Sequence, residues 1–260
     1  MHRFFKRKVG AAAAALLAGV ALATMAGSAA AATAVAPLIP MLDIEARVSY
    51  ETRQVMSSGV TRVDTWQERL VRRGNQVWTE RILAPVAHAG HALDGHERAG
   101  HEREKVAEHA GHRHFNAETS ARWLTLKPDG QVEVRFVDRE HKIVVSVPRA
   151  EFGTVGFDGR FDGAASIVPP AVVQAMTPTT ARPVGGSADG QWLTDRSQGW
   201  SHKLLWSAPG QLALRVESTR DDGSVQRRVT VQLLPAAPAM PAPWSQLADY
   251  TPKQYDDFMD

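Results

Sequence analysis

The sequence contains no cysteine. A chain without thiols forms no disulfide and offers neither a thiolate metal ligand nor a thiol nucleophile. Hydrolase motifs are missing as well. There is no Gly-x-Ser-x-Gly elbow, and the pair His96-Glu97 is followed by His101, one residue too far for the HExxH helix of zinc proteases. We therefore expect no enzyme activity, and any metal site would rely on imidazole rather than thiolate.

Long apolar runs are absent beyond the N-terminus. One run covers residues 9–23, follows four basic residues and precedes small ones, the pattern of a secretory signal peptide over residues 1–32. With about fifteen residues it is shorter than the about twenty that span a bilayer, so the exported chain is expected to be soluble, periplasmic and without a transmembrane segment. Removing the leader leaves 26 of the 30 basic residues against 28 acidic ones. This balance gives no reason to expect nucleic acid as a partner.

Alternation of apolar and polar residues dominates the rest of the chain. From Leu42 to Glu51 the residues alternate in this way, which predicts a strand with one solvent-facing side. Arg73-Gly74-Asn75 and Asp221-Asp222-Gly223 supply turns between later strands. Those strands are expected at residues 60–72, 76–83, 122–126, 132–137, 142–147, 190–194, 200–206, 212–219 and 225–233. Residues 151–190 break the pattern, with a short helix expected at 170–176.

About ten strands in consecutive hairpins predict a β-rich α+β fold, a curved antiparallel sheet or half-open β-barrel with one or two short helices. We expect one domain over residues 33–234, interrupted by a histidine-rich insert at 86–118. Residues 235–260 are expected to form a proline-rich connector and a short C-terminal helix that begins near Thr251. This tail should dock on the sheet through its large apolar residues, Trp244, Leu247, Tyr250, Tyr255 and Phe258.

The order of these elements resembles a known family. A leader, a strand with Tyr50-Glu51-Thr52-Arg53, a meander rich in Trp and Arg, and a late ladder over residues 200–231 are similar to the periplasmic LolA-like lipoprotein carriers and the related RseB-like stress-signalling proteins. The resemblance implies a half-barrel with an apolar groove for acyl chains or lipoprotein. It carries no site residue over, and the histidine-rich insert departs from the pattern.

The insert holds the most specific chemistry in the sequence. Seven of the ten histidines fall within residues 88–114, and imidazole is a good ligand for copper, zinc and nickel. The candidate ligands are His109, His112, His114, His101, His96, His91 and His88. We rank the first three highest because they lie nearest the following strand. The alternative is a solvated low-complexity loop whose histidines bind nothing.

Two functions are compatible with these patterns. The first is an exported metal-binding protein that buffers, delivers or senses a divalent transition metal (Cu, Zn or Ni) through the insert. The second is a periplasmic carrier or envelope-signalling module that binds a lipid, a lipoprotein or an envelope protein in the concave face of its sheet. Asp158 and Asp162 are weaker candidates, for calcium. His141 and His202 are expected to be structural, and the seven tryptophans are expected in the core rather than in a ligand groove.

Overall fold

A computed structural model describes residues 41–83, 116–117, 119–179, 190–235 and 241–258. The strands in these ranges are β1 (Ile44–Val55), β2 (Thr61–Arg73), β3 (Gln76–Arg81), β4 (Ala121–Leu126), β5 (Val132–Asp138), β6 (Ile143–Val147), β7 (Thr177–Pro178), β8 (Gly190–Ser197), β9 (Trp200–Ser207), β10 (Leu212–Arg220), β11 (Val225–Leu233) and β12 (Thr251–Gln254). The helices are α1 (Phe161–Ser166), α2 (Pro170–Ala175) and the 3-10 helices η1 (Arg149–Glu151), η2 (Pro243–Gln246) and η3 (Tyr255–Phe258). No helix in the described ranges is long and apolar enough to cross a membrane.

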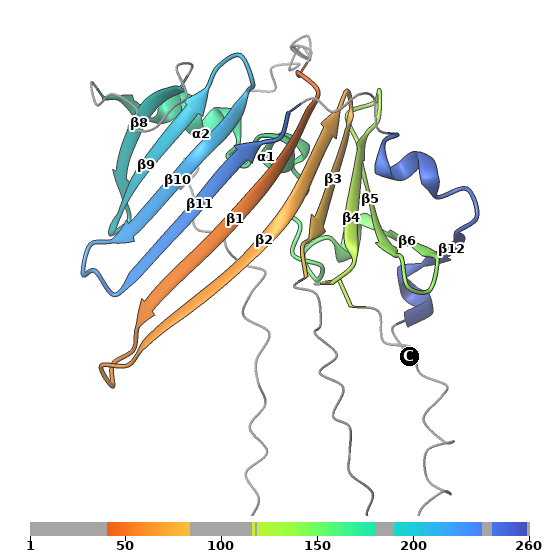
Figure 1. Cartoon of the computed structure of the whole chain (residues 1–260), viewed down its shortest axis with the longest axis horizontal. Helices are drawn as coiled ribbons and strands as arrows, with labels where there is room; N and C mark the ends of the chain where they lie inside the picture. Colours follow the sequence, from red (N-terminus) through yellow and green to blue (C-terminus); the bar gives the residue numbers. More distant parts are fainter. Residues whose placement is uncertain (1–40, 84–115, 118, 180–189, 236–240, 259–260) are drawn as a thin grey trace, which may run out of the picture.

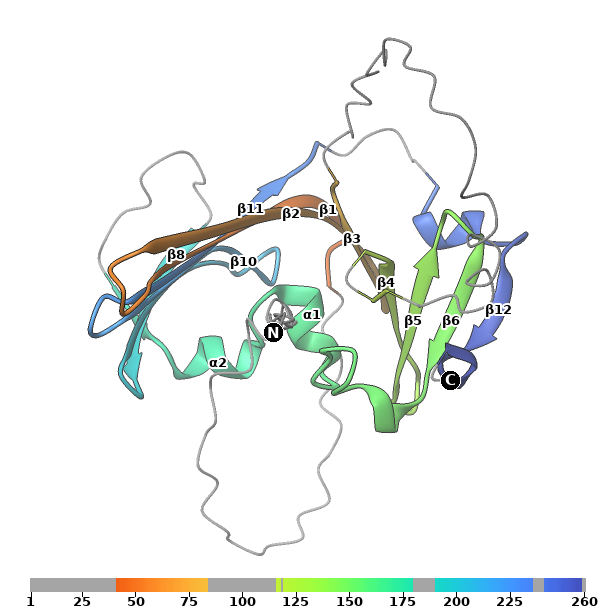
Figure 2. The ribbon, with the colours of Figure 1, turned by 90° about the horizontal axis from the view of Figure 1, so that it is seen from below.

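All the strands belong to one sheet of order β12-β6-β5-β4-β3-β2-β1-β11-β10-β9-β8-β7. Neighbouring strands pair antiparallel except β12 and β6, which run parallel. Strand β1 lies between β2 and β11 and so joins the earlier and later halves of the chain (Figure 1). The sheet curves over α1 and α2 without closing (Figure 2). The expected strand-rich, half-open fold is confirmed, with 12 strands rather than about ten.

The alternation in β1 decides which face of the sheet carries the main core. Ala46 and Val48 are buried, whereas Arg47 between them is exposed. Ala46 pairs in register with Leu70 of β2, and both belong to the main cluster of buried side chains, to which α1 contributes Phe161. Helices α1 and α2 lie on the concave side of the sheet (Figure 2), and because Phe161 of α1 belongs to this cluster, the cluster lies on that face. Burying a side chain as large as leucine stabilises the fold by about 1.5–3 kcal/mol.

Of the two α-helices, one was predicted from the sequence and the other was not. Helix α2 confirms the short helix expected near Pro170, whose fixed φ suits the first helical turn. Helix α1 was not predicted, because Asp162 and Gly163 are poor helix formers. Its Phe161 and Ala165 are buried, and it contacts β4 and β10. Tertiary packing therefore stabilises a helix that the local sequence does not favour.

The C-terminal tail docks on the sheet as expected. Trp244 stacks on Trp123 with ring centroids 6.4 Å apart and an interplanar angle of 6°, and Tyr255 is buried. The expected helix start at Thr251 was wrong, since Thr251–Gln254 form strand β12 and a 3-10 helix begins only at Tyr255. The physical reason is the open edge of β6. Its backbone groups pair with the tail, as in the 2.8 Å bond from Thr251 N to Lys142 O, and this pairing outweighs the capping signal.

Candidate ligand-binding face

The concave face has a covered part and an open part. Helix α1 contacts β4 and β10 toward one end of the strands, and the described helices do not reach the opposite ends of β1, β2, β10 and β11 (Figure 1). There the strand register aligns two rows of side chains across the sheet. The aromatic row is Trp66, Tyr50, Val229, Val216 and Leu204, and the polar row is Asp64, Thr52, Arg227, Ser218, His202 and Asp195.

The aromatic row is apolar, and solvent reaches part of it, since Val229 and Leu204 are buried whereas Tyr50, Trp66 and Val216 are partly exposed. Tyr50 and Trp66 face each other on β1 and β2 and stack at 4.9 Å with an interplanar angle of 10°. Both are half-buried. The Tyr50 hydroxyl donates to Glu68 at 3.1 Å, and burial, reinforced by the Glu68 carboxylate, raises the pKa of Tyr50 well above its usual value. Tyr50 therefore stays neutral, with the Glu68 carboxylate beside its hydroxyl.

The polar row contains a hydrogen-bonded pair at its centre. The His202 ring nitrogen Nδ1 lies 2.8 Å from the Ser218 hydroxyl on the neighbouring strand, and the ring stacks on Trp200 at 6.3 Å. Burial lowers the pKa of His202, and the charge of Arg227 lowers it further, while Asp195 opposes them. Burial therefore favours the neutral ring, and the contact with Ser218 joins β9 to β10.

Three arginines of the concave face have no carboxylate partner in the described part of the chain. Arg81 lies 5.7 Å from the centre of the Trp66 ring, and Arg227 lies 5.0 Å from the centre of the Trp200 ring. Arg122 lies near Tyr50, and its positive charge acts to lower the pKa of Tyr50, against the larger effect of burial. The Nε atoms of Arg122 and Arg227 are buried without a hydrogen-bond partner. Leaving a buried charged donor unpaired costs free energy, so these cations are suited to an anion brought from outside.

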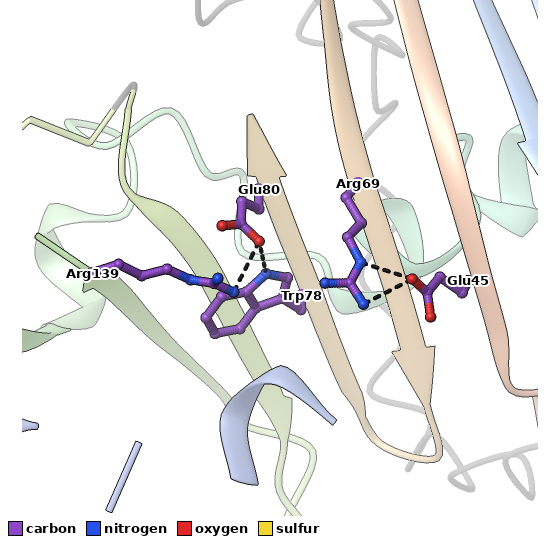
Figure 3. Close-up of polar contacts among 5 residues, drawn as sticks. All are labelled: Glu45, Arg69, Trp78, Glu80 and Arg139. Atoms are coloured by element: carbon purple, nitrogen blue, oxygen red, sulfur yellow. Dashed lines mark hydrogen bonds and ion pairs between the residues drawn. The ribbon is translucent and has the colours of Figure 1, made fainter. Parts of the chain in front are cut away.

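Several arginines of the convex face are paired with carboxylates. Figure 3 shows Arg69 paired with Glu45 at 2.8 Å, and Arg139 paired with Glu80 at 3.0 Å above the buried Trp78 ring. Further along the sheet, Arg215 is paired with Glu217. Such half-exposed pairs contribute only about 0–1 kcal/mol each, but they leave the positive charge matched locally. Arg81, Arg122 and Arg227 differ from these three arginines in having no carboxylate partner among the described residues.

The polar row does not form a catalytic triad, although Ser218, His202 and Asp195 lie on consecutive strands. Asp195 accepts a 2.7 Å hydrogen bond from the Ser197 hydroxyl, and no bond between Asp195 and His202 is formed among the described residues. The backbone of these strands is occupied in sheet pairing, so it offers no converging N–H groups for an oxyanion. The arrangement is suited to holding a ligand rather than to activating a nucleophile.

The histidines predicted to bind metal, His88, His91, His96, His101, His109, His112 and His114, lie outside the described residues. Within the described ranges no three His, Asp or Glu side chains are grouped to hold a metal ion. His141 lies at the turn after β5 and contacts Asp138 at 2.8 Å. Asp158 accepts a bond from the Arg160 backbone and Asp162 pairs with the Arg160 side chain, so both serve the turn before α1.

The tryptophans divide between core and surface. Trp78 is fully buried, as expected for core, whereas Trp66 and Trp200 are half-exposed on the concave face. Sequence reasoning missed the open rows. The signal was present in β1, where Tyr50 and Thr52 continue the inward positions of Ala46 and Val48 but change from apolar to polar.

Two surface hollows also occur in the described part of the protein. One of about 270 Å³ beside β5 and β6 is lined by Lys127, Glu133 and Arg135, which are already paired with one another. Hydrogen bonding by Lys127 lowers the pKa of Glu133. The other, of about 350 Å³, is lined by residues of the convex face such as Ser49 and Thr65, together with Tyr50 and Trp66.

No family model and no curated protein match this sequence. Solved structures match it over most of its length, but weakly. An uncharacterized conserved protein from Thermus thermophilus is 12% identical, with a TM-score of 0.36 over 80% of this chain and 90% of that one. A putative outer membrane lipoprotein-sorting protein domain from Vibrio parahaemolyticus is 7% identical, with a TM-score of 0.30 over 79% and 89%.

The matches also include the MucA/MucB complex of Pseudomonas aeruginosa, at 14% identity and a TM-score of 0.32 over 78% of this chain and 54% of that one. A LolA superfamily protein from Nitrosomonas europaea has 9% identity and a TM-score of 0.28, over 76% and 89%. At such low identities and TM-scores these matches do not assign the chain to a family.

Proposed function

We propose that this protein is an exported, non-catalytic binding protein whose concave face holds the hydrocarbon part of a lipid or lipoprotein. The observation that carries the proposal is the aromatic row. Trp66, Tyr50 and Val216 lie half-exposed on the same face that elsewhere forms the core. An apolar strip continuous with a core and open to solvent is stabilised when an apolar ligand covers it.

The sheet edges favour this face over binding by strand addition. Both edge strands are short and contain a proline, Pro178 in β7 and Pro252 in β12. Proline donates no backbone hydrogen bond and therefore discourages a further strand. A ligand bound through side chains of the concave face meets no such obstacle. Acyl cargo is also what the resemblance to LolA-like carriers implies.

The test is binding of a neutral single-chain amphiphile, dodecyl dimethylamine oxide, at neutral pH and below its micelle concentration. Calorimetry should show saturable binding, and native mass spectrometry should show copurified acyl lipid. Trp66→Ala should weaken binding by about tenfold, since a lost aromatic contact is worth more than about 1.4 kcal/mol. Trp192→Ala is the matched control, because Trp192 pairs with Leu205 on the convex side of β8. Absence of both heat and copurified lipid would refute the proposal.

A second candidate function rests on the histidine density of residues 88–114, seven in 27 positions. We propose that His109, His112 and His114 bind copper(II), zinc or nickel, helped by His88, His91, His96 and His101. Because neutral imidazole is the ligand, metal bound at a pH of about 7.5 should be released near about 5. Calorimetry with zinc on untagged protein tests this. No heat at micromolar metal identifies a solvated loop.

A further inference from the structure

We propose that the bound lipid carries an anionic head group, which Arg227 of the polar row binds. This inference rests on the proposed function and adds the chemistry of the head group to it. The hydrocarbon chain would lie on the aromatic row, and the head group on the polar row beside it. Tyr50 of the aromatic row and Thr52, the register partner of Arg227, are two residues apart in β1 and share the concave face, so the two parts of one ligand would meet the two rows about 7 Å apart.

The charges around Arg227 leave it without a counterion. Both carboxylates of the polar row are engaged elsewhere, since Asp64 pairs with Arg62 at 2.8 Å and Asp195 accepts from Ser197 at 2.7 Å. Arg227 has no ion pair in the described part of the protein, and its Nε is buried without a partner. A phosphate, sulfate or carboxylate placed at its guanidinium would supply the missing negative charge.

The surroundings also orient this guanidinium. It lies 5.0 Å from the centre of the Trp200 ring, and arginine stacked on an aromatic ring keeps its planar fork of donors in a fixed direction. Thr52, its register partner on β1, has a buried hydroxyl oxygen with no hydrogen-bond partner, and Ser218 on the other side carries a second hydroxyl. Arg227 therefore stands among neutral polar groups that leave its charge uncancelled.

The experiment compares two amphiphiles with the same chain, dodecyl phosphate and dodecyl dimethylamine oxide, by calorimetry at neutral pH. We expect dodecyl phosphate to bind about tenfold more tightly, the effect of one hydrogen bond to a charged group. Arg227→Gln should remove this preference and leave the neutral amphiphile unaffected. Arg228→Gln is the matched control, because the next residue lies on the convex face and is close to Glu51 and Glu217.

The outcomes separate this inference from the proposed function. If both amphiphiles bind equally, or if Arg227→Gln weakens both alike, the anionic head group is wrong while the carrier function stands. If inorganic phosphate alone binds as well as dodecyl phosphate, the face is a free-anion site and both fail. Should Arg227→Gln not fold, Arg227→Lys serves as the second variant. It keeps the positive charge but loses the planar fork of donors, so the preference for dodecyl phosphate should shrink, and an unchanged preference would contradict the assignment to the Arg227 guanidinium.

Discussion

The guanidinium of Arg72 donates a 2.7 Å hydrogen bond to the backbone carbonyl of Ala165, 93 positions away in the sequence. The same group donates to the carbonyls of Leu42, Gly210 and Gln211. Burial lowers the pKa of Arg72 to about 10, with Asp43 opposing the shift, so the side chain stays charged at neutral pH. This contact ties α1 to β2 and to the β9–β10 turn, and it holds the helices at one end of the concave face.

Replacing Arg72 should therefore destabilise the whole fold. Arg72→Met leaves several buried or half-buried carbonyls without a donor, and each such unsatisfied group costs about 1–3 kcal/mol. Urea denaturation measures the free energy of unfolding. Arg69→Met removes a half-exposed ion pair of the convex face and should cost no more than about 1 kcal/mol. Similar losses of unfolding free energy in the two variants would contradict the conclusion that Arg72 holds α1 to β2 and to the β9–β10 turn.

The docked tail should contribute measurably to stability. Trp244 packs on Trp123 with the second buried cluster, and Trp244→Ala removes an apolar contact worth about 1.5–3 kcal/mol. We expect a lower melting temperature in calorimetry, and a similar or larger drop on truncation at Pro243. Gln246→Ala, at an exposed position of the same 3-10 helix, is the control. An unchanged melt in the truncated chain would mean that the tail is displayed for a partner.

The stability of the protein should fall as the pH drops below about 6.5, in part because of His202. Its pKa is lowered from 6.5 by burial in the folded state. Above that pH both folded and unfolded forms carry a neutral ring. Between a pH of about 6.5 and the lowered pKa of the folded state, His202 binds a proton in the unfolded chain but not in the folded one, so stability falls as the pH drops through this window.

His202→Gln should flatten this dependence. The quantity to compare is the change in unfolding free energy between a pH of about 7.5 and about 5.5. His141→Gln is the control, since His141 is exposed at the turn after β5 rather than packed in the sheet. An unaltered pH dependence in the His202 variant would show that the ring is not held neutral by burial.

The histidine-rich insert should be dispensable for folding. Its flanking strands β3 and β4 are antiparallel neighbours, with Thr79 opposite Arg122, so the chain on both sides of the insert is anchored in adjacent strands. Replacing residues 86–111 by a short Gly/Ser linker should leave a single cooperative unfolding transition, because changing loop length costs only about 0.6 kcal/mol per doubling. Circular dichroism melts measure this. A chain that fails to fold would show that the insert is structural.

The sequence by itself determined most of the strands. Period-two alternation, as in Ala46, Arg47 and Val48, depends only on which side chains prefer water, and a turn such as Arg73-Gly74-Asn75 depends on the left-handed φ of 54° that Gly74 adopts without strain. These are local preferences, and they can be predicted without knowing the neighbours. The half-open, strand-rich class followed from counting such segments.

Only the tertiary structure decided which parts of those strands stay open. Alternation places Arg72 and Arg227 on the same inward side as their apolar neighbours. Arg72 donates to carbonyls 93 and 139 positions away, whereas Arg227 has no counterion among the described residues. The same is true of β12, which becomes a strand because β6 offers an unpaired edge. The partners of Arg72 and of β12 are distant in sequence, so these stabilising contacts exist only after the chain has folded.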